Sequence, residues 1–94
     1  MAGEKIEYGP DGRLVVPDEP VIPYIEGDGV GPDIWRASVR VFEAAVQKCY
    51  GNRRRVRWLE AFAGEKAFGL KRDWAPEETI EAILEYKVGI KGPL

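Results

Sequence analysis

The order of apolar segments predicts an α/β fold with parallel strand pairing. Short runs rich in β-branched and aromatic residues alternate with longer amphipathic runs, giving strand, helix, strand, helix, strand along 94 residues. This alternation is typical of parallel strands joined by right-handed helical crossovers. A parallel sheet is buried on both faces and normally has more than three strands. We therefore expect an incomplete portion of a larger fold, completed by further sequence or another chain.

The first strand of the sheet is predicted at residues 21–25, where the sequence reads VIPYI. Pro23 cannot donate a ladder hydrogen bond, so the strand is expected to begin after it or to lie near a sheet edge. Polar residues and two turn signals come before this strand. We assign residues 1–19 to a polar leader, with a short edge strand at 13–16, and residues 20–94 to the βαβαβ segment.

A helix is predicted after the glycines at 27, 29 and 31. Pro32 suits the first helical position, Asp33 is favourable near the positive end of the helix dipole, and Gly51 marks the end. Apolar residues recur at three- and four-residue spacing, which predicts a buried face. The members of this face are Ile34, Ala37, Val41, Ala45 and Cys49, widened by Phe42 and Val46.

The remaining segments complete the alternation. Residues 53–61 predict a second strand, and residues 63–75 predict a loop with room for one helical turn. Pro76 opens a second helix, which carries acidic residues in its first turn. The apolar face of that helix consists of Ile80, Ile83 and Leu84. Residues 87–91 predict the third strand.

Composition excludes several classes of function. The net charge of −2 gives no overall attraction to nucleic acid or to an anionic membrane, so neither is expected as a partner. The chain has no apolar run close to the ~18 residues of a spanning helix. The lone cysteine favours a reducing cytoplasm. Because the sequence contains no histidine, histidine-based catalytic triads and histidine metal ligands are excluded within this chain.

Four arginines surround the start of the second strand, next to a tryptophan. Basic residues interleaved with an aromatic residue resemble a nucleic-acid surface. The arginines are at 53, 54, 55 and 57, and Trp58 follows them. We interpret them as a solvated margin of the sheet, balanced by the acidic residues at 77, 78, 81 and 85.

The glycine-rich turn "EGDGVGP" matches no phosphate-binding fingerprint. The third glycine of G-x-G-x-x-G would fall at Pro32 or Ile34, and the sequence has no Gly-Lys-Ser or Gly-Lys-Thr. Two interpretations remain open on the residues alone: a tight strand-to-helix turn, or a backbone that a ligand approaches closely. Asp28 is expected to cap the following helix or to form a hydrogen bond within the turn.

The segment Lys91-Gly92-Pro93-Leu94 points to a ligand site. In open α/β sheets, ligands bind at the carboxyl ends of the strands. Lys91 ends the third predicted strand, and the loop at residues 26–31 ends the first. Both loops should lie on the same edge of the sheet, which favours a ligand there over a purely structural turn.

Several longer motifs resemble a known family. "VIPYIEGDGVGPDI", "AGEKAFG", "EYKVGIKGPL" and the leader "GRLVVPDEPVIPYIEGDG" are similar to the N-terminal part of bacterial-type NADP-dependent isocitrate dehydrogenases, over residues 12–94. The glycine turn alone is shared with isopropylmalate dehydrogenases, whereas "IKGPL" and the leader favour the isocitrate branch. The alternatives are a segment of isopropylmalate or homoisocitrate dehydrogenase, or a non-enzymatic module derived from the family.

The resemblance implies a homodimeric cytoplasmic enzyme of the tricarboxylic acid cycle. Such an enzyme oxidises isocitrate to 2-oxoglutarate with NADP⁺ and releases CO₂, with Mg²⁺ or Mn²⁺ polarising the carbonyl. By the same resemblance, Val30, Lys91 and Leu94 would contact the cofactor, and Lys91 would also contact the substrate. The family's catalytic residues and metal ligands are not in this chain, so 94 residues alone are not expected to be active.

Overall fold

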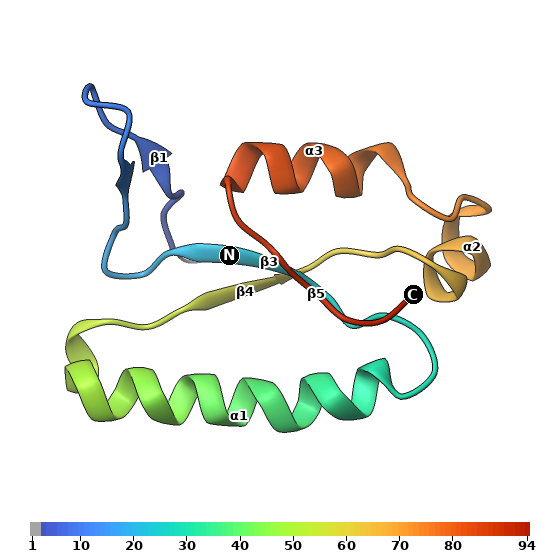
Figure 1. Cartoon of the computed structure of the whole chain (residues 1–94), viewed down its shortest axis with the longest axis horizontal. Helices are drawn as coiled ribbons and strands as arrows, with labels where there is room; N and C mark the ends of the chain where they lie inside the picture. Colours follow the sequence, from blue (N-terminus) through green and yellow to red (C-terminus); the bar gives the residue numbers. More distant parts are fainter. Residues whose placement is uncertain (1–2) are drawn as a thin grey trace.

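Figure 1 shows a parallel sheet between two helices. The structure, a computed structural model, describes residues 3–94. The strand order is β4 (Arg57–Glu60), β3 (Val21–Ile25) and β5 (Ile90–Lys91), and β3 is parallel to both neighbours. Helix α1 (Gly31–Tyr50) covers one face, and α3 (Glu77–Tyr86) covers the other. The predicted fold class, a partial α/β sheet with parallel pairing, is confirmed.

The residues before β3 form a hairpin outside this sheet. Strand β1 (Glu7–Tyr8) pairs antiparallel with β2 (Leu14–Val15), so the short strand expected at the sheet edge belongs to a separate two-stranded ribbon. Ile6 is buried, and the Val21 amide donates to the Glu4 carbonyl at 2.9 Å. The hairpin is therefore attached to the start of the central strand.

The prediction for Pro23 is wrong, because β3 contains this residue and is the central strand. The amides of Arg57 and Ala61 donate to the carbonyls of Pro20 and Tyr24, so the even-numbered residues of β3 hydrogen-bond to β4. The ring of Pro23 therefore faces the opposite edge, where β5 pairs only with Tyr24 and Ile25. Pro23 would need a backbone N–H only for pairing with β5, and β5 begins one residue further along.

Helix α1 has the predicted ends but packs with a different face. It begins at Gly31 with Pro32 in its first turn and stops at Gly51, which has a φ of 61° and donates its N–H to the Gln47 carbonyl. Trp35, which is not in the predicted stripe, contacts the sheet: its ring stacks on Tyr24 with centroids 4.2 Å apart. Of the predicted face, Phe42 packs against Trp58 of β4 and Val46 is half-buried, whereas the other members, including Val41 with 65% exposure, are exposed.

Cys49 lies on that exposed stripe and is a free, exposed thiol, so its expected burial is also wrong. The aromatic residues explain the choice of face. Trp35 and Phe42 meet Trp58 of β4 at centroid distances of 5.1 and 6.1 Å, and large rings remove more apolar area from water than alanine or cysteine does. The helix therefore packs on the sheet through Trp35 and Phe42, and of these two only Phe42 belongs to the predicted face.

The other side of the sheet has a small core. Ile25, Ala61 and Ala63 are buried together, and Ile83 of α3 packs against them. Ile80 and Leu84 are exposed, so only one member of the predicted apolar face of α3 contacts this core.

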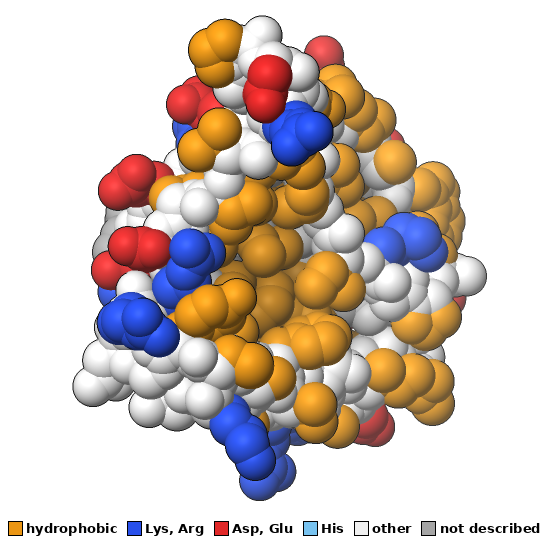
Figure 2. All heavy atoms as spheres, turned by 60° about the vertical axis from the view of Figure 1, so that its left-hand side comes forward, with side chains coloured by type: hydrophobic (Ala, Val, Ile, Leu, Met, Phe, Trp, Pro, Cys, Tyr) orange, Lys and Arg blue, Asp and Glu red, His pale blue; other side chains and the backbone are white. Residues whose placement is uncertain are grey.

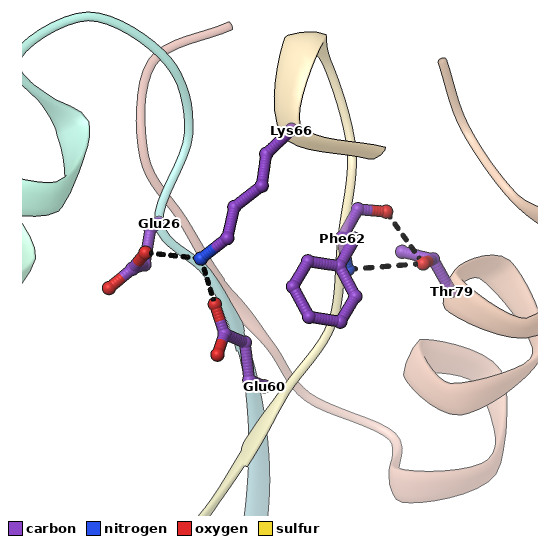
Figure 3. Close-up of polar contacts among 5 residues, drawn as sticks. All are labelled: Glu26, Glu60, Phe62, Lys66 and Thr79. Atoms are coloured by element: carbon purple, nitrogen blue, oxygen red, sulfur yellow. Dashed lines mark hydrogen bonds and ion pairs between the residues drawn. The ribbon is translucent and has the colours of Figure 1, made fainter. Parts of the chain in front are cut away.

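A buried threonine provides the polar link between α3 and the chain after β4. The Thr79 hydroxyl donates to the Phe62 carbonyl at 2.7 Å and accepts from the Phe62 amide at 3.3 Å, as Figure 3 shows. In the sequence between Phe62 and Thr79 lies the helix α2 (Glu65–Lys71). The sequence predicted a loop with room for one helical turn there.

Apolar surface remains exposed on several elements. Figure 2 shows a hollow lined with hydrophobic side chains, with charged residues around its margin. Large exposed hydrophobic residues also lie on the hairpin, α1 and α3, among them Val15, Val41 and Leu84. No helix in the described part of the chain is long and apolar enough to span a membrane. Exposed apolar patches on proteins are typical of surfaces that contact other protein, a membrane or a ligand.

We predict that these 94 residues, prepared alone, do not unfold cooperatively. The core is small and the sheet edges are open, so the isolated chain should bind a hydrophobic dye and melt over a broad temperature range. Calorimetry and dye fluorescence measure this. A single sharp transition from a monomer without dye binding would contradict the prediction.

Candidate functional site

Two loops meet at the carboxyl ends of β3 and β5, as predicted. The Asp28 amide donates to the Pro93 carbonyl at 2.7 Å, and the Gly92 amide donates to the Ile25 carbonyl at 2.8 Å. These bonds join the glycine turn after β3 to the segment after β5. The edge where α/β sheets bind ligands is thus built from both segments.

The glycines allow the two backbones to touch. A Cβ atom on Gly27 would lie 2.2 Å from the Pro93 carbonyl oxygen. A Cβ on Gly31 or Gly92 would lie 2.2 or 2.1 Å from the Glu26 carbonyl oxygen. Real Cβ atoms do not approach oxygen so closely, so a side chain at Gly27 or Gly92 would force the two loops apart, and one at Gly31 would open the turn itself. The structure therefore supports a tight junction of two loops.

The three predicted contact residues lie on these joined loops. Val30 and Leu94 expose 63% and 61% of their surface. Lys91 is also exposed, and its ammonium group donates to the Gly92 carbonyl at 2.9 Å. The edge thus combines two apolar side chains with one cation.

Asp28 does not cap the helix that follows it. Both of its carboxylate oxygens accept from the amide of Glu65, the first residue of α2, at 3.0 and 3.1 Å. Its backbone carbonyl accepts from Gly31, which closes the turn. The side chain therefore satisfies an unpaired N–H at the start of a distant helix. Sequence spacing gave no sign of this contact, because the two residues are 37 positions apart.

Lys66 links the carboxyl ends of β3 and β4. Its ammonium group lies 2.9 Å from Glu26 Oε1, after β3, and 2.7 Å from Glu60 Oε2, at the end of β4 (Figure 3). Hydrogen bonds to Glu60 and then to Glu26 raise the pKa of Lys66 from 10.5 to about 12. Sequence reasoning did not single out these three residues, although Lys66 lies within the motif "AGEKAFG".

Tyr24 lies beside this cluster, under the ring of Trp35. Burial raises the pKa of its hydroxyl, and the negative charges of Glu60 and Glu26 raise it further. Tyr24 therefore stays protonated at neutral pH.

The described residues contain no group of three His, Cys, Asp or Glu side chains that could hold a metal ion. At the candidate edge, the carboxylates of Glu26 and Glu60 are both bound to Lys66, and that of Asp28 is bound to a backbone amide.

The arginines near β4 belong to the opposite end of the strands. Arg54 pairs with Asp18 at 3.5 Å and Arg57 pairs with Glu19 at 2.6 Å, so the acids that balance them come from before β3 rather than from α3. A cavity of about 550 Å³ lies there, between the end of α1 and the start of β4. It is separate from the edge that carries Lys91.

Comparison with known proteins identifies the family. The family model "Isocitrate/isopropylmalate dehydrogenase" matches residues 21–94, which include both loops of the junction. The chain belongs to this family. The resemblance found in its motifs is thereby confirmed.

Its relatives include enzymes from several bacteria. The chain is 52% identical over 94 residues to "Isocitrate dehydrogenase [NADP]" of Staphylococcus aureus strain Mu50, covering 100% of this chain and 22% of that protein. "Isocitrate dehydrogenase [NADP] 1" of Colwellia maris is 52% identical over 98% of this chain and 22% of its own length. The Streptococcus mutans enzyme is 50% identical over 97% of this chain and 23% of its own length. The chain thus spans less than a quarter of these relatives and matches their N-terminal part.

We predict that Gly27→Ala destabilises the full-length protein more than Gly29→Ala does. Both glycines have positive φ, 86° and 58°, so alanine at either position costs about 1–2 kcal/mol of backbone strain. Only at Gly27 would the new Cβ also meet Pro93, since nothing lies within 4 Å of a Cβ on Gly29. Thermal unfolding of both variants measures the difference. Equal losses would show that the loops are not in close contact.

A second prediction concerns alkaline pH. Because the pKa of Lys66 is raised on folding, its ion pairs stabilise the protein fully below pH 10.5 and lose this effect as the pH rises through about 12. The stability advantage of the wild type over Lys66→Met should therefore shrink across this interval. Its size is modest, since the side chain is 42% exposed.

Denaturant titrations at pH 8, 10 and 12 give the comparison. The matched control is the double variant Glu26→Gln, Glu60→Gln, which keeps the lysine but removes its charged partners. In that background the wild-type lysine should have little advantage at any pH. An advantage that stays constant up to pH 12 would contradict the assignment.

Proposed function

We propose that this chain is the N-terminal segment of an NADP-dependent isocitrate dehydrogenase, in which its carboxyl edge forms part of the substrate and nicotinamide pocket. The observation that carries the proposal is the junction of the loops bearing Val30, Lys91 and Leu94, joined by the hydrogen bond from Asp28 to Pro93. The names of the relatives support the choice of isocitrate and NADP over isopropylmalate or homoisocitrate.

Each contact residue has a chemical role in this proposal. The ammonium group of Lys91 attracts a carboxylate of isocitrate or a phosphate of the cofactor as a compact point charge. Val30 and Leu94 offer exposed apolar surface against the nicotinamide ring. The backbone of the glycine turn lets the cofactor approach closely, since no side chain projects from Gly29.

The chemistry of decarboxylation needs groups beyond these. A divalent cation, Mg²⁺ or Mn²⁺, would supply Lewis-acid chemistry at a substrate carbonyl. The described residues of this chain do not form its site, so we assign them binding and orientation only. A homodimeric, cytoplasmic enzyme of the tricarboxylic acid cycle belongs to the same proposal and is supported by the family resemblance.

The rival interpretation is a non-enzymatic module that keeps the family fold. An assay of the full-length protein separates the two interpretations. NADP⁺ reduction is measured with isocitrate and Mg²⁺, and then with isopropylmalate and homoisocitrate as alternative substrates. Activity with isocitrate supports the proposal. Activity confined to another β-hydroxyacid, or none at all, would overturn it.

In the full-length enzyme, we predict that Lys91→Ala lowers kcat/KM for isocitrate about 10- to 100-fold. Losing a hydrogen bond to a charged group costs about 1.5–3 kcal/mol. Lys91→Arg, which keeps the charge but changes its shape, should lose less. Steady-state kinetics at saturating Mg²⁺ measure both variants. An unchanged kcat/KM in Lys91→Ala would remove this residue from the site.

A further inference from the structure

We propose that Asp28 is a positioning residue of the active site, which acts by tying the start of α2 to the two ligand-facing loops. The inference rests on the proposed function, because it concerns the placement of Val30, Lys91 and Leu94. It assigns to Asp28 and Glu65 a role that neither residue's position in the sequence indicates.

Asp28 forms hydrogen bonds with the loop after β5, with the start of α1 and with the start of α2. Its amide donates to Pro93 at 2.7 Å, its carbonyl accepts from Gly31 at 2.9 Å, and its carboxylate accepts from the Glu65 amide at 3.0 Å. The first bond holds the loop after β5, and the second closes the turn before α1. The third fixes the side chain itself to a distant helix, and with it the orientation of the whole turn.

The start of α2 is shaped around this carboxylate. A Cβ on Gly64 would lie 2.2 Å from Asp28 Oδ2, and the φ of Gly64 is +77°, so only glycine fits between the turn and the helix. The helix supplies no capping side chain of its own at Gly64. Asp28 thus replaces the missing local cap.

The next residue of α2 is held to the strands independently. Lys66 bridges Glu26, which follows β3, and Glu60, which ends β4 (Figure 3). The first turn of α2 is therefore anchored to the sheet, which makes it a fixed support for Asp28. Because Lys66 holds the helix and Asp28 holds the turn, the position of the turn is set relative to the rigid sheet.

This arrangement argues against acid–base chemistry by Asp28. Both carboxylate oxygens already accept the same backbone N–H, within 3.1 Å. A general base needs an oxygen directed at the proton it removes. The contact that matters is hydrogen-bond acceptance, which an amide oxygen also provides.

The test uses four substitutions in the full-length enzyme. Asp28→Ala removes the acceptor, whereas Asp28→Asn keeps an oxygen acceptor without charge. Glu65→Pro removes the donor N–H at the first helical position, where proline is otherwise tolerated, and Glu65→Ala keeps that N–H. Asp11→Ala is the matched remote control, because Asp11 accepts from the Arg13 amide at 3.0 Å in the hairpin.

We expect Asp28→Ala and Glu65→Pro to lower kcat/KM for isocitrate at least tenfold, with a raised KM for isocitrate or NADP⁺. Asp28→Asn and Glu65→Ala should stay within about threefold of the wild type, which corresponds to less than about 0.7 kcal/mol. Asp11→Ala should leave kinetics unchanged. Thermal unfolding of every variant separates loss of fold from loss of placement.

Two results would overturn the proposal. If Asp28→Ala lowers only the unfolding temperature and leaves kcat/KM intact, the contact is structural alone. If Asp28→Asn is as damaging as Asp28→Ala, the charge of Asp28 rather than its hydrogen bond is what the enzyme uses.

The activity of the wild-type protein distinguishes failure of the proposed function from failure of the positioning role. If it does not turn over isocitrate with NADP⁺, amide hydrogen exchange replaces kinetics as the readout. Positioning by Asp28 then requires faster exchange at residues 89–94 in Asp28→Ala but not in Asp28→Asn. Unchanged exchange in that segment would overturn the positioning role on its own.

Discussion

At the carboxyl edge of the sheet, the backbone of the loop after β3 lies directly against the backbone of the loop after β5. The carbonyl of Pro93 lies against Gly27, and the carbonyl of Glu26 lies against Gly92, at distances that exclude a Cβ atom. This contact fixes the turn that starts α1 and the segment that leaves β5. Any ligand bound at this edge meets both loops together, so their spacing determines the shape of that part of the pocket.

Much of the fold could be predicted from the sequence because its signals are local. The alternation of strand and helix, the ends of α1 at Pro32 and Gly51, and the meeting of two loops at one edge all follow from short-range patterns and from parallel topology. The buried face of α1 could not be predicted this way. Apolar residues lie on more than one side of that helix. The side that packs on the sheet carries Trp35, because its ring meets Tyr24 and Trp58, which belong to other elements.

The candidate site shows the same division. Lys91 and the glycine turn could be placed at the edge from strand order alone. The contact of the Asp28 carboxylate with Glu65 and that of Lys66 with Glu26 could not, because these partners are 37 and 40 residues apart and α2 has only seven residues. These long-range polar contacts hold the edge together. Helices α1 and α3 also carry exposed apolar residues, a feature typical of protein contact surfaces. The chain belongs to the isocitrate/isopropylmalate dehydrogenase family and spans less than a quarter of its relatives' length.

A crystal structure of the full-length protein with NADP⁺ and isocitrate tests the central claim most directly. The account predicts Lys91 Nζ within about 3 Å of an anionic oxygen of a ligand, and Val30 and Leu94 within about 4 Å of the nicotinamide ring. It also predicts that the hydrogen bonds from Asp28 to Pro93 and from Glu65 to Asp28 persist. Both ligands bound elsewhere, with this edge facing solvent or covered by protein, would contradict the account.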